Sequence, residues 1–186
     1  MQLPANNQEN PEREMLRRPL LTYIAPSVTG HRMARVAVGG TFDPVHDGHL
    51  VLLKKAFEVA GEDGTVVVAM TSDEMATSQR TRPVRDFETR LRNLEKILVD
   101  ELDVDNFRVE TLHNVYGSAI EADYDVIVVS PETYPVACKI NETRIENGLP
   151  LIRVVRVEYE MAEDEVRISS TRIYKGEINH HGKMMV

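Results

Sequence analysis

The sequence predicts an α/β protein with a Rossmann-like, open parallel sheet of about five strands and helices on both faces. Three observations lead to this class: short runs of apolar and β-branched residues, helical patterns between them, and the regular alternation of the two. Strands that are apolar on both faces are typical of a parallel sheet that helices cover on each side. Alternating strands and helices then require right-handed crossover connections.

The expected strands are short runs rich in valine and other apolar residues. Runs of this length, bounded by turn-forming residues, are typical of strands buried inside a sheet. They are residues 35–38, 65–70, 107–112, 125–129 and 151–157.

Helical spacing of apolar residues separates these strands. The expected helices span residues 50–60, 87–98 and 133–147. Glycine follows the first and the third, at Gly61 and Gly148, where it is placed to end a helix.

Residues 1–32 differ from the rest of the chain, because they contain four prolines among polar residues and precede the alternation. We expect them to form an extension that is flexible or loosely docked. One domain over residues 33–186 is then the simplest organisation.

The composition, with 42% hydrophobic and 28% charged residues, is ordinary for a soluble globular protein. The single cysteine, Cys138, excludes an internal disulfide framework. No apolar run approaches the roughly 20 residues that cross a bilayer, and the polar start lacks the apolar stretch of a signal peptide. We therefore expect a cytoplasmic protein with no membrane association.

The net charge is −8, so the basic footprint of a nucleic-acid-binding protein is absent and we expect no nucleic-acid partner. An acidic protein still binds anions where it gathers positive groups in one cleft. The densest basic stretch follows the second expected strand, and we expect one or two of its arginines to face a cleft. They are Arg80, Arg82, Arg85, Arg90 and Arg92.

The most informative segment is residues 39–50, Gly-Gly-Thr-Phe-Asp-Pro-Val-His-Asp-Gly-His-Leu. We call residues 39–49 the histidine turn. Glycine allows a sharp turn or a close approach to a ligand. His46 and His49 are three residues apart at a helix start, so they lie on one side and can reach one bound group together. Unpaired N–H groups at that helix start favour an anion. The segment therefore predicts a phosphate site, at the carboxyl end of the first strand, where α/β folds bind ligands.

A second segment, Ile168-Ser169-Ser170-Thr171-Arg172, combines hydroxyl groups with an arginine at the start of a final helix. These groups can bind phosphate oxygens, although the same serines also suit a helix cap. We call this segment the final motif.

Two motifs carry a resemblance to the nucleotidylyltransferase superfamily: Gly40-Thr41-Phe42-Asp43 with His46-x-Gly48-His49, and the final motif continued by Ile173. A third stretch, Ser130-Pro131-Glu132-Thr133, resembles the phosphopantetheine adenylyltransferases of archaeal and eukaryotic type. Asn141-x-x-Arg144, Ala162-Glu163-Asp164 and Gly176-Glu177-Ile178 add to it, and the resemblance covers roughly residues 34–182. Tyr174 departs from it, because a basic residue is expected there.

The resemblance implies an enzyme of coenzyme A synthesis, with ATP and 4'-phosphopantetheine as its substrates and Mg²⁺ held largely by ATP and water. No metal site made by the protein itself is expected, and the oligomeric state stays open. Expected catalytic residues are His46, His49 and Arg172. Expected nucleotide-binding residues are Gly39, Gly40, Thr41, Phe42, His46, His49, Ser130, Glu132, Thr133, Ser169, Ser170, Thr171 and Arg172; expected acceptor-binding residues are Thr41, Asp43, Arg80, Arg82 and Arg85.

Two alternatives remain at this point. The same chemistry could act on another phosphorylated acceptor, such as flavin mononucleotide or nicotinamide mononucleotide. A non-catalytic nucleotide-binding protein is the second alternative, and the presence of His46, His49 and Arg172 together argues against it.

Overall fold

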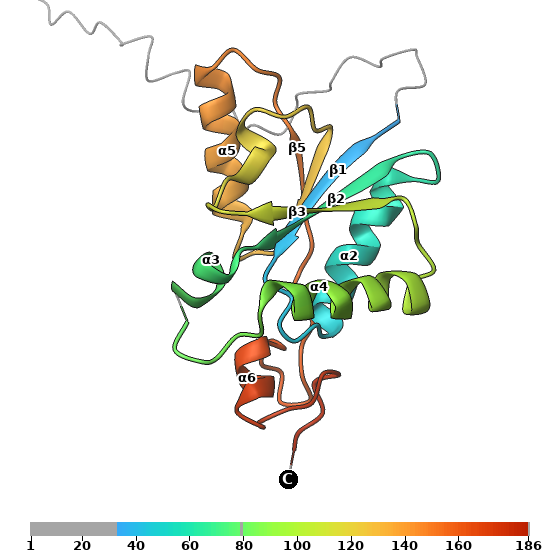
Figure 1. Ribbon diagram of the computed structural model, residues 1–186, viewed down its shortest axis with the longest axis vertical. Helices are drawn as coiled ribbons and strands as arrows, with labels where there is room; N and C mark the ends of the chain where they lie inside the picture. The colour runs from blue at the N-terminus through green and yellow to red at the C-terminus, as the bar shows by residue number, and fades with distance from the viewer. Residues whose placement is uncertain (1–32, 79, 186) are drawn as a thin grey trace, which may run out of the picture. The chain divides into compact units, whose positions relative to one another are not determined.

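The computed structural model describes residues 33–78 and 80–185, and within them five parallel strands form one sheet (Figure 1). Their order is β3-β2-β1-β4-β5. The bounds are β1 Arg35–Gly40, β2 Thr65–Thr71, β3 Phe107–Leu112, β4 Val126–Val129 and β5 Arg153–Arg156. The predicted fold class is confirmed. The predicted extension, residues 1–32, lies outside the described residues.

Helices connect successive strands and cover both faces of the sheet. No helix among residues 33–78 and 80–185 is long and apolar enough to cross a membrane. The α-helices are α2 Asp47–Ala60, α3 Asp73–Ser78, α4 Phe87–Lys96, α5 Tyr134–Glu146 and α6 Ser170–Tyr174. Helix α4 continues as a π-helical turn, η2 (Ile97–Glu101), and a 3₁₀ turn, η3 (Gly117–Ile120), precedes β4.

All five predicted strands and the three helices predicted from apolar spacing are present, with ends shifted by a few residues, and the final helix predicted at the final motif is α6. The sequence did not predict α3 or η3. Both are short, and each buries a single residue, Ala76 in α3 and Ala119 in η3. Elements of this length have no apolar period to detect.

The two faces of the sheet differ in the size of their side chains. In β1, Val36 and Val38 pack with α2 and α4, whereas Ala37 belongs to the core under α5 and η3. Small residues on the second face leave room between the sheet and α5. The second face therefore has its own smaller core, and beside it Ala37, Gly39 and Ala69 line a cavity that can hold a ligand.

The chain leaves β1 toward β2 and β3, then returns to the far side of β1 to form β4 and β5. This reversal between β1 and β4 is the topological switch point, where open α/β sheets bind their ligands. The end of β1 carries the histidine turn, and the end of β4 carries Ser130.

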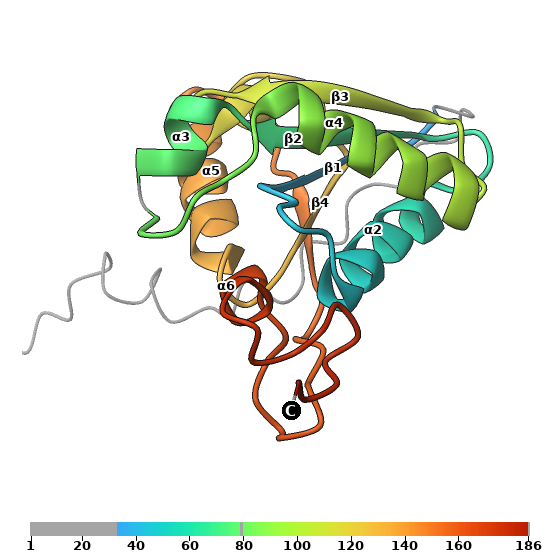
Figure 2. The ribbon, with the colours of Figure 1, turned by 60° about the horizontal axis from the view of Figure 1, so that its bottom comes forward.

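The segment after β5 packs against the start of α2. Asp47 N–H donates to the carbonyl of His180 over 3.1 Å, and the Ser170 hydroxyl donates to the carbonyl of Pro44 over 3.1 Å. Figure 2 shows this red C-terminal segment, including α6, next to the first turn of α2. The final motif is thereby brought to the histidine turn, although more than a hundred residues separate them in the sequence.

Candidate active site

A cleft of about 500 Å³ opens over the carboxyl ends of the central strands. The histidine turn, the turn after β4 and the final motif all contribute to its lining. Most of the predicted nucleotide-binding residues therefore share one cavity. They are Gly39, Gly40, Thr41, Phe42, His46, His49, Ser130, Glu132, Thr133, Ser169, Ser170 and Thr171.

Phe42 shapes the histidine turn. It has a φ of 53°, in the left-handed region that non-glycine residues rarely adopt, and its side chain is buried. A Cβ on Gly40 would lie 3.0 Å from the Phe42 ring, so a side chain at residue 40 would displace it. The Phe42 ring in turn contacts the ring of His49, with centroids 5.1 Å apart. Glycine at residue 40 thus sets the position of a predicted catalytic histidine.

The two histidines stack against each other, with ring centroids 3.9 Å apart. Gly48 makes this possible, because a Cβ there would lie 3.2 Å from the His46 ring. Both rings line the cleft, and the Nδ1 atoms of both are buried without a hydrogen-bond partner among the described residues. Native proteins rarely leave buried polar atoms unsatisfied except at functional positions.

Burial keeps both imidazoles neutral at pH 7. It lowers the pKa of His46 to about 4, with a further lowering from nearby His180 and a partial opposing effect of Asp47. Burial also lowers the pKa of His49 well below its usual value, helped by His46 and Arg80. A bound anion would oppose these effects, because it favours the protonated ring.

The final motif reaches the cleft through its hydroxyl side. Ser169 caps α6 by accepting from the backbone N–H of Arg172, and Ser170 is tied to the histidine turn. The cap and the cleft lining therefore use the same residues, as the sequence suggested.

Arg172 is placed differently from the rest of the final motif. Its guanidinium forms ion pairs with Asp164 and Glu177 and donates to the carbonyls of Val166 and Arg167. It does not belong to the residues that line the cleft. Its hydrogen bond and ion pair with Asp164 raise the pKa of the guanidinium despite partial burial. A catalytic or phosphate-binding role of Arg172 stays a prediction, and it requires these ion pairs to open.

Of the predicted acceptor-binding residues, Arg82 and Arg85 both bind Asp43. The Asp43 carboxylate, 3% exposed, accepts from the Arg85 backbone N–H at 3.0 Å, from Arg85 Nε and from Arg82 Nη1 at 3.4 Å. Burial alone would raise the pKa of Asp43, but the Arg85 hydrogen bonds and the two positive charges lower it. Arg82 and Arg80 line the cleft, whereas Arg85 lines a neighbouring crevice. A role of these residues in binding the acceptor stays a prediction.

Arg90, one of the five arginines in the basic stretch, is completely buried. Its guanidinium donates to the carbonyls of Thr41 and Arg85, to the Thr71 hydroxyl and to the Asp73 carboxylate, over 2.9 to 3.3 Å. It joins the ends of β1 and β2 to the loop before α4 that contains Arg85. This role could not be predicted from the sequence, because a charge run usually lies on a solvated surface.

The Ser130–Thr133 turn leads from β4 into α5. The Thr133 hydroxyl accepts from the Ser130 backbone N–H at 3.1 Å, which fixes the turn. Glu132 instead reaches across the cleft mouth to Arg167, at 2.7 Å. All three residues that the sequence indicated here line the cleft.

Two histidines that the sequence did not indicate support the histidine turn. The His180 ring contacts the Val45 carbonyl at 2.7 Å, and His181 Nδ1 lies 3.0 Å from the Asp47 carboxylate. No local pattern could reveal this, since the partners are 135 and 134 positions apart in the sequence.

Away from the histidines the cleft becomes apolar. It continues between the second face of the sheet and α5, with η3 as its end wall. The sheet contributes Ala37, Gly39 and Ala69, and α5 contributes Val136, Ala137 and Ile140. The cleft thus has a polar half suited to phosphates and an apolar half suited to a less polar group.

No group of three or more His, Cys, Asp or Glu side chains that could hold a metal occurs in residues 33–78 and 80–185. Mg²⁺ bound with ATP therefore stays a prediction, with phosphate oxygens and water as its ligands.

Known proteins resemble this chain in sequence and in fold. Residues 37–176 match the cytidylyltransferase-like family. A phosphopantetheine adenylyltransferase of Methanosarcina barkeri is 50% identical, over 82% of this chain and 93% of that protein. One from Methanosarcina acetivorans is 51% identical, over 82% of this chain and 96% of that protein. A crystal structure of an Archaeoglobus fulgidus protein of unknown function superposes with a TM-score of 0.61 and 37% identity, over 68% of this chain and 99% of that one.

The chain belongs to the cytidylyltransferase-like family and, within it, to the group of the archaeal phosphopantetheine adenylyltransferases.

Proposed function

We propose that the protein transfers AMP from ATP to 4'-phosphopantetheine, giving dephospho-coenzyme A and pyrophosphate. Archaeal relatives with this name are about half identical over most of the chain. The observation that carries the proposal is that the stacked pair of His46 and His49 lines the same cleft as the hydroxyl residues of the final motif. A triphosphate needs contacts on both sides of its α-phosphate, and this arrangement supplies them.

In the reaction, a phosphate oxygen of the acceptor attacks the α-phosphorus of ATP, and the bond to the β-phosphate oxygen breaks. The acceptor phosphate is already an anion, so no strong general base is needed. Enzymes of this kind act mainly by positioning and by compensating charge. The sequence accordingly needs no Ser–His–Asp arrangement.

His49, supported by the stacked His46, stabilises the charge that grows on the α-phosphate oxygens. Ser169, Ser170 and Thr171 hold the leaving pyrophosphate. Mg²⁺, carried in with ATP, neutralises phosphate charge when bound.

The apolar half of the cleft supports the choice of acceptor. Phosphopantetheine carries a long, uncharged arm behind its phosphate, and the space between Ala37, Ala69 and α5 suits such an arm. The phosphate end then lies toward the histidines and Arg80. The cytoplasmic location and the absence of a nucleic-acid partner stay predictions from composition.

Pyrophosphate release tests the proposal. Purified protein is given ATP and Mg²⁺ with one acceptor at a time: 4'-phosphopantetheine, flavin mononucleotide or nicotinamide mononucleotide. We expect release with phosphopantetheine alone. Release with one of the mononucleotides, and none with phosphopantetheine, would contradict it.

A further inference from the structure

Helix α5 places a charged residue where its own pattern requires an apolar one. Ala137 and Ile140 face the core, and Arg144 is the next residue on the same face. It is 2% exposed. Burying a guanidinium is costly unless its donors are satisfied. A leucine or methionine would fill the position more simply, so the arginine requires an explanation.

The donors of Arg144 bind three backbone carbonyls from two other segments. Nη1 donates to Ala119 at 2.9 Å and to Ala122 at 2.8 Å, and Nε donates to Pro150 at 2.7 Å. Ala119 belongs to η3, Ala122 follows it, and Pro150 lies between α5 and β5. Burial lowers the pKa of Arg144, with a partial opposing effect of Asp123.

Asn141 acts in the same way one turn earlier in α5. Its side-chain amide pairs with both backbone groups of Ile152: Nδ2 donates to the carbonyl at 2.8 Å, and Oδ1 accepts from the N–H at 2.9 Å. Asn141 and Arg144 are three residues apart, so they share one side of the helix. Together they fasten α5 to the segments on either side of it.

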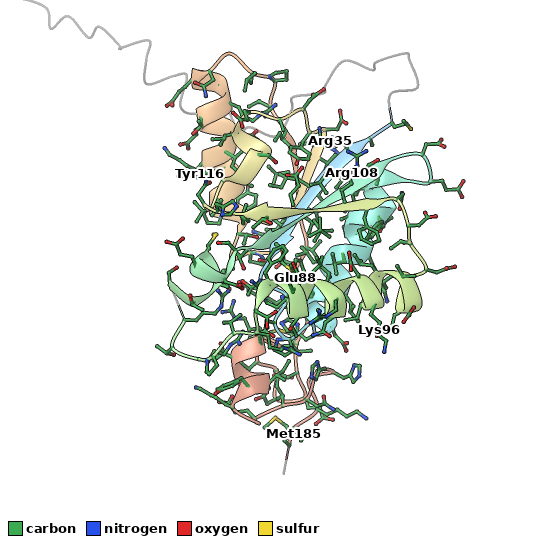
Figure 3. All side chains as sticks on the ribbon, in the orientation of Figure 1. Arg35, Glu88, Lys96, Arg108, Tyr116 and Met185 are labelled. Atoms are coloured by element: carbon green, nitrogen blue, oxygen red, sulfur yellow. The ribbon has the colours of Figure 1, made fainter. Side chains whose placement is uncertain are left out.

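One of these segments is the end wall of the apolar half of the cleft. Gly117, Ser118 and Ala119 of η3 line the cleft, as does the preceding Tyr116. We call residues 116–119 the acceptor wall. Figure 3 labels Tyr116 where the acceptor wall lies beside α5. A short 3₁₀ turn has few hydrogen bonds of its own, so external contacts decide how firmly it is held.

We propose that Arg144 is a positioning residue that holds the acceptor wall in place for the arm of the acceptor substrate. Asn141 supports it by fixing α5 to the backbone of Ile152. This inference rests on the proposed function, since it assigns the apolar half of the cleft to that arm. Arg144 itself touches no substrate. The histidines and the final motif bind the ATP phosphates from another part of the cleft, and none of them contacts Arg144 through a hydrogen bond in the described residues.

The two substrates should therefore respond differently to a change at residue 144. Arg144→Met keeps an apolar stem and removes all three hydrogen bonds. We expect the KM for 4'-phosphopantetheine to rise about tenfold, while the KM for ATP changes by less than about twofold. Arg144→Lys keeps the charge but loses the planar fork, so its effect should be intermediate.

The experiment measures both KM values and kcat by pyrophosphate release for the wild type and both variants. Lys139→Met is the matched control, because Lys139 lies on the same helix, is exposed and forms its ion pair with Glu142, away from the carbonyls that Arg144 binds. Arg144→Lys, the milder change, also covers the case in which Arg144→Met does not fold. Hydrogen exchange of amides 117–122 in Arg144→Lys should be faster than in the wild type.

Equal rises in both KM values, or unchanged acceptor KM and unchanged exchange in Arg144→Lys, would overturn the inference. Absence of wild-type turnover with phosphopantetheine would instead overturn the proposed function. If another acceptor is used by the wild type, the same comparison of KM values is made with that acceptor, and the same outcomes decide.

Discussion

The histidine turn and the final motif were both predicted to hold ATP, yet their charged and titratable side chains are in different situations. The Nδ1 atoms of His46 and His49 are buried and have no hydrogen-bond partner within residues 33–78 and 80–185, and burial lowers the pKa of both rings. Arg172 already has two carboxylates and two carbonyls. The histidine turn keeps polar atoms unsatisfied, whereas the final motif uses its arginine to hold its own surroundings.

A residue of a motif can bind the ligand or stabilise the fold, and the groups that it contacts in the structure show which of these roles it has. The hydroxyls of the final motif line the cleft, but its cation does not. Arg80, by contrast, lines the cleft, and its positive charge contributes to the lowered pKa of His49. Variants of His49, Arg80, Arg172 and His46 separate residues that act in the site from residues that stabilise the fold.

The largest effect is expected for His49→Ala. Loss of the group that stabilises the growing charge should lower kcat by about a thousandfold, as for other electrostatic stabilisers. The thermal unfolding midpoint should stay close to that of the wild type, because the Nδ1 atom of His49 has no hydrogen-bond partner within residues 33–78 and 80–185. His113→Ala, at an exposed position, serves as the control and should keep full activity. Retention of activity in His49→Ala would remove the assigned role.

Arg80→Met should have the next largest effect. Arg80 lines the cleft. Burial, and to a smaller extent the nearby Arg82 charge, lowers the pKa of Arg80, and a bound anion would relieve both effects. We expect the KM for one phosphorylated substrate to rise about tenfold to a hundredfold. Arg108→Met, on an exposed residue of β3, is the matched control. An unchanged KM for both substrates would show that Arg80 binds neither.

Arg172→Met tests the other side of the comparison. If Arg172 serves the fold, the variant should unfold at a lower temperature, and kcat should fall less than in His49→Ala. Calorimetry and the pyrophosphate assay measure the two effects. A loss of kcat equal to that of His49→Ala, at an unchanged unfolding midpoint, would show that Arg172 leaves its carboxylates to bind phosphate.

The smallest effect concerns the pH dependence of stability. The pKa of His46 is about 4 in the folded protein, whereas the ordinary pKa of a histidine is 6.5, so below pH 6.5 the unfolded chain binds the extra proton. Stability should therefore decrease as the pH falls from 6.5 toward 4, by up to about 1.4 kcal/mol per pH unit from this residue. Urea unfolding at several pH values measures the slope, and His46→Gln should reduce it. If the slope of stability against pH were the same in His46→Gln and in the wild type, His46 would be protonated as readily in the folded state as in the unfolded state.

Much of the fold was predictable because it depends on local patterns. Valine-rich runs and helical spacing placed five strands and three helices, and Gly61 and Gly148 marked two helix ends. Both glycines have a positive φ, of 70° and 68°, which explains why glycine stands there. The α3 and η3 turns escaped prediction because each buries only one residue.

The site was predictable to the extent that it is contiguous. Residues 39–49 form one turn whose parts touch, so their order in the chain already indicates their chemistry. The acceptor wall could not be found in this way, because Arg144 binds carbonyls more than twenty residues away. The same holds for Arg90, which joins segments from Thr41 to Arg85.

By itself, the sequence determined the fold class, the phosphate chemistry and the family, because these depend on residue types at short, fixed spacings. The tertiary structure decided which cations face the ligand. It left Arg80 in the cleft, fastened Arg172 to Asp164 and Glu177, and buried Arg90 and Arg144 as internal supports. The physical reason is that an arginine acts through the partner it meets, and the folded chain alone brings the partner to it.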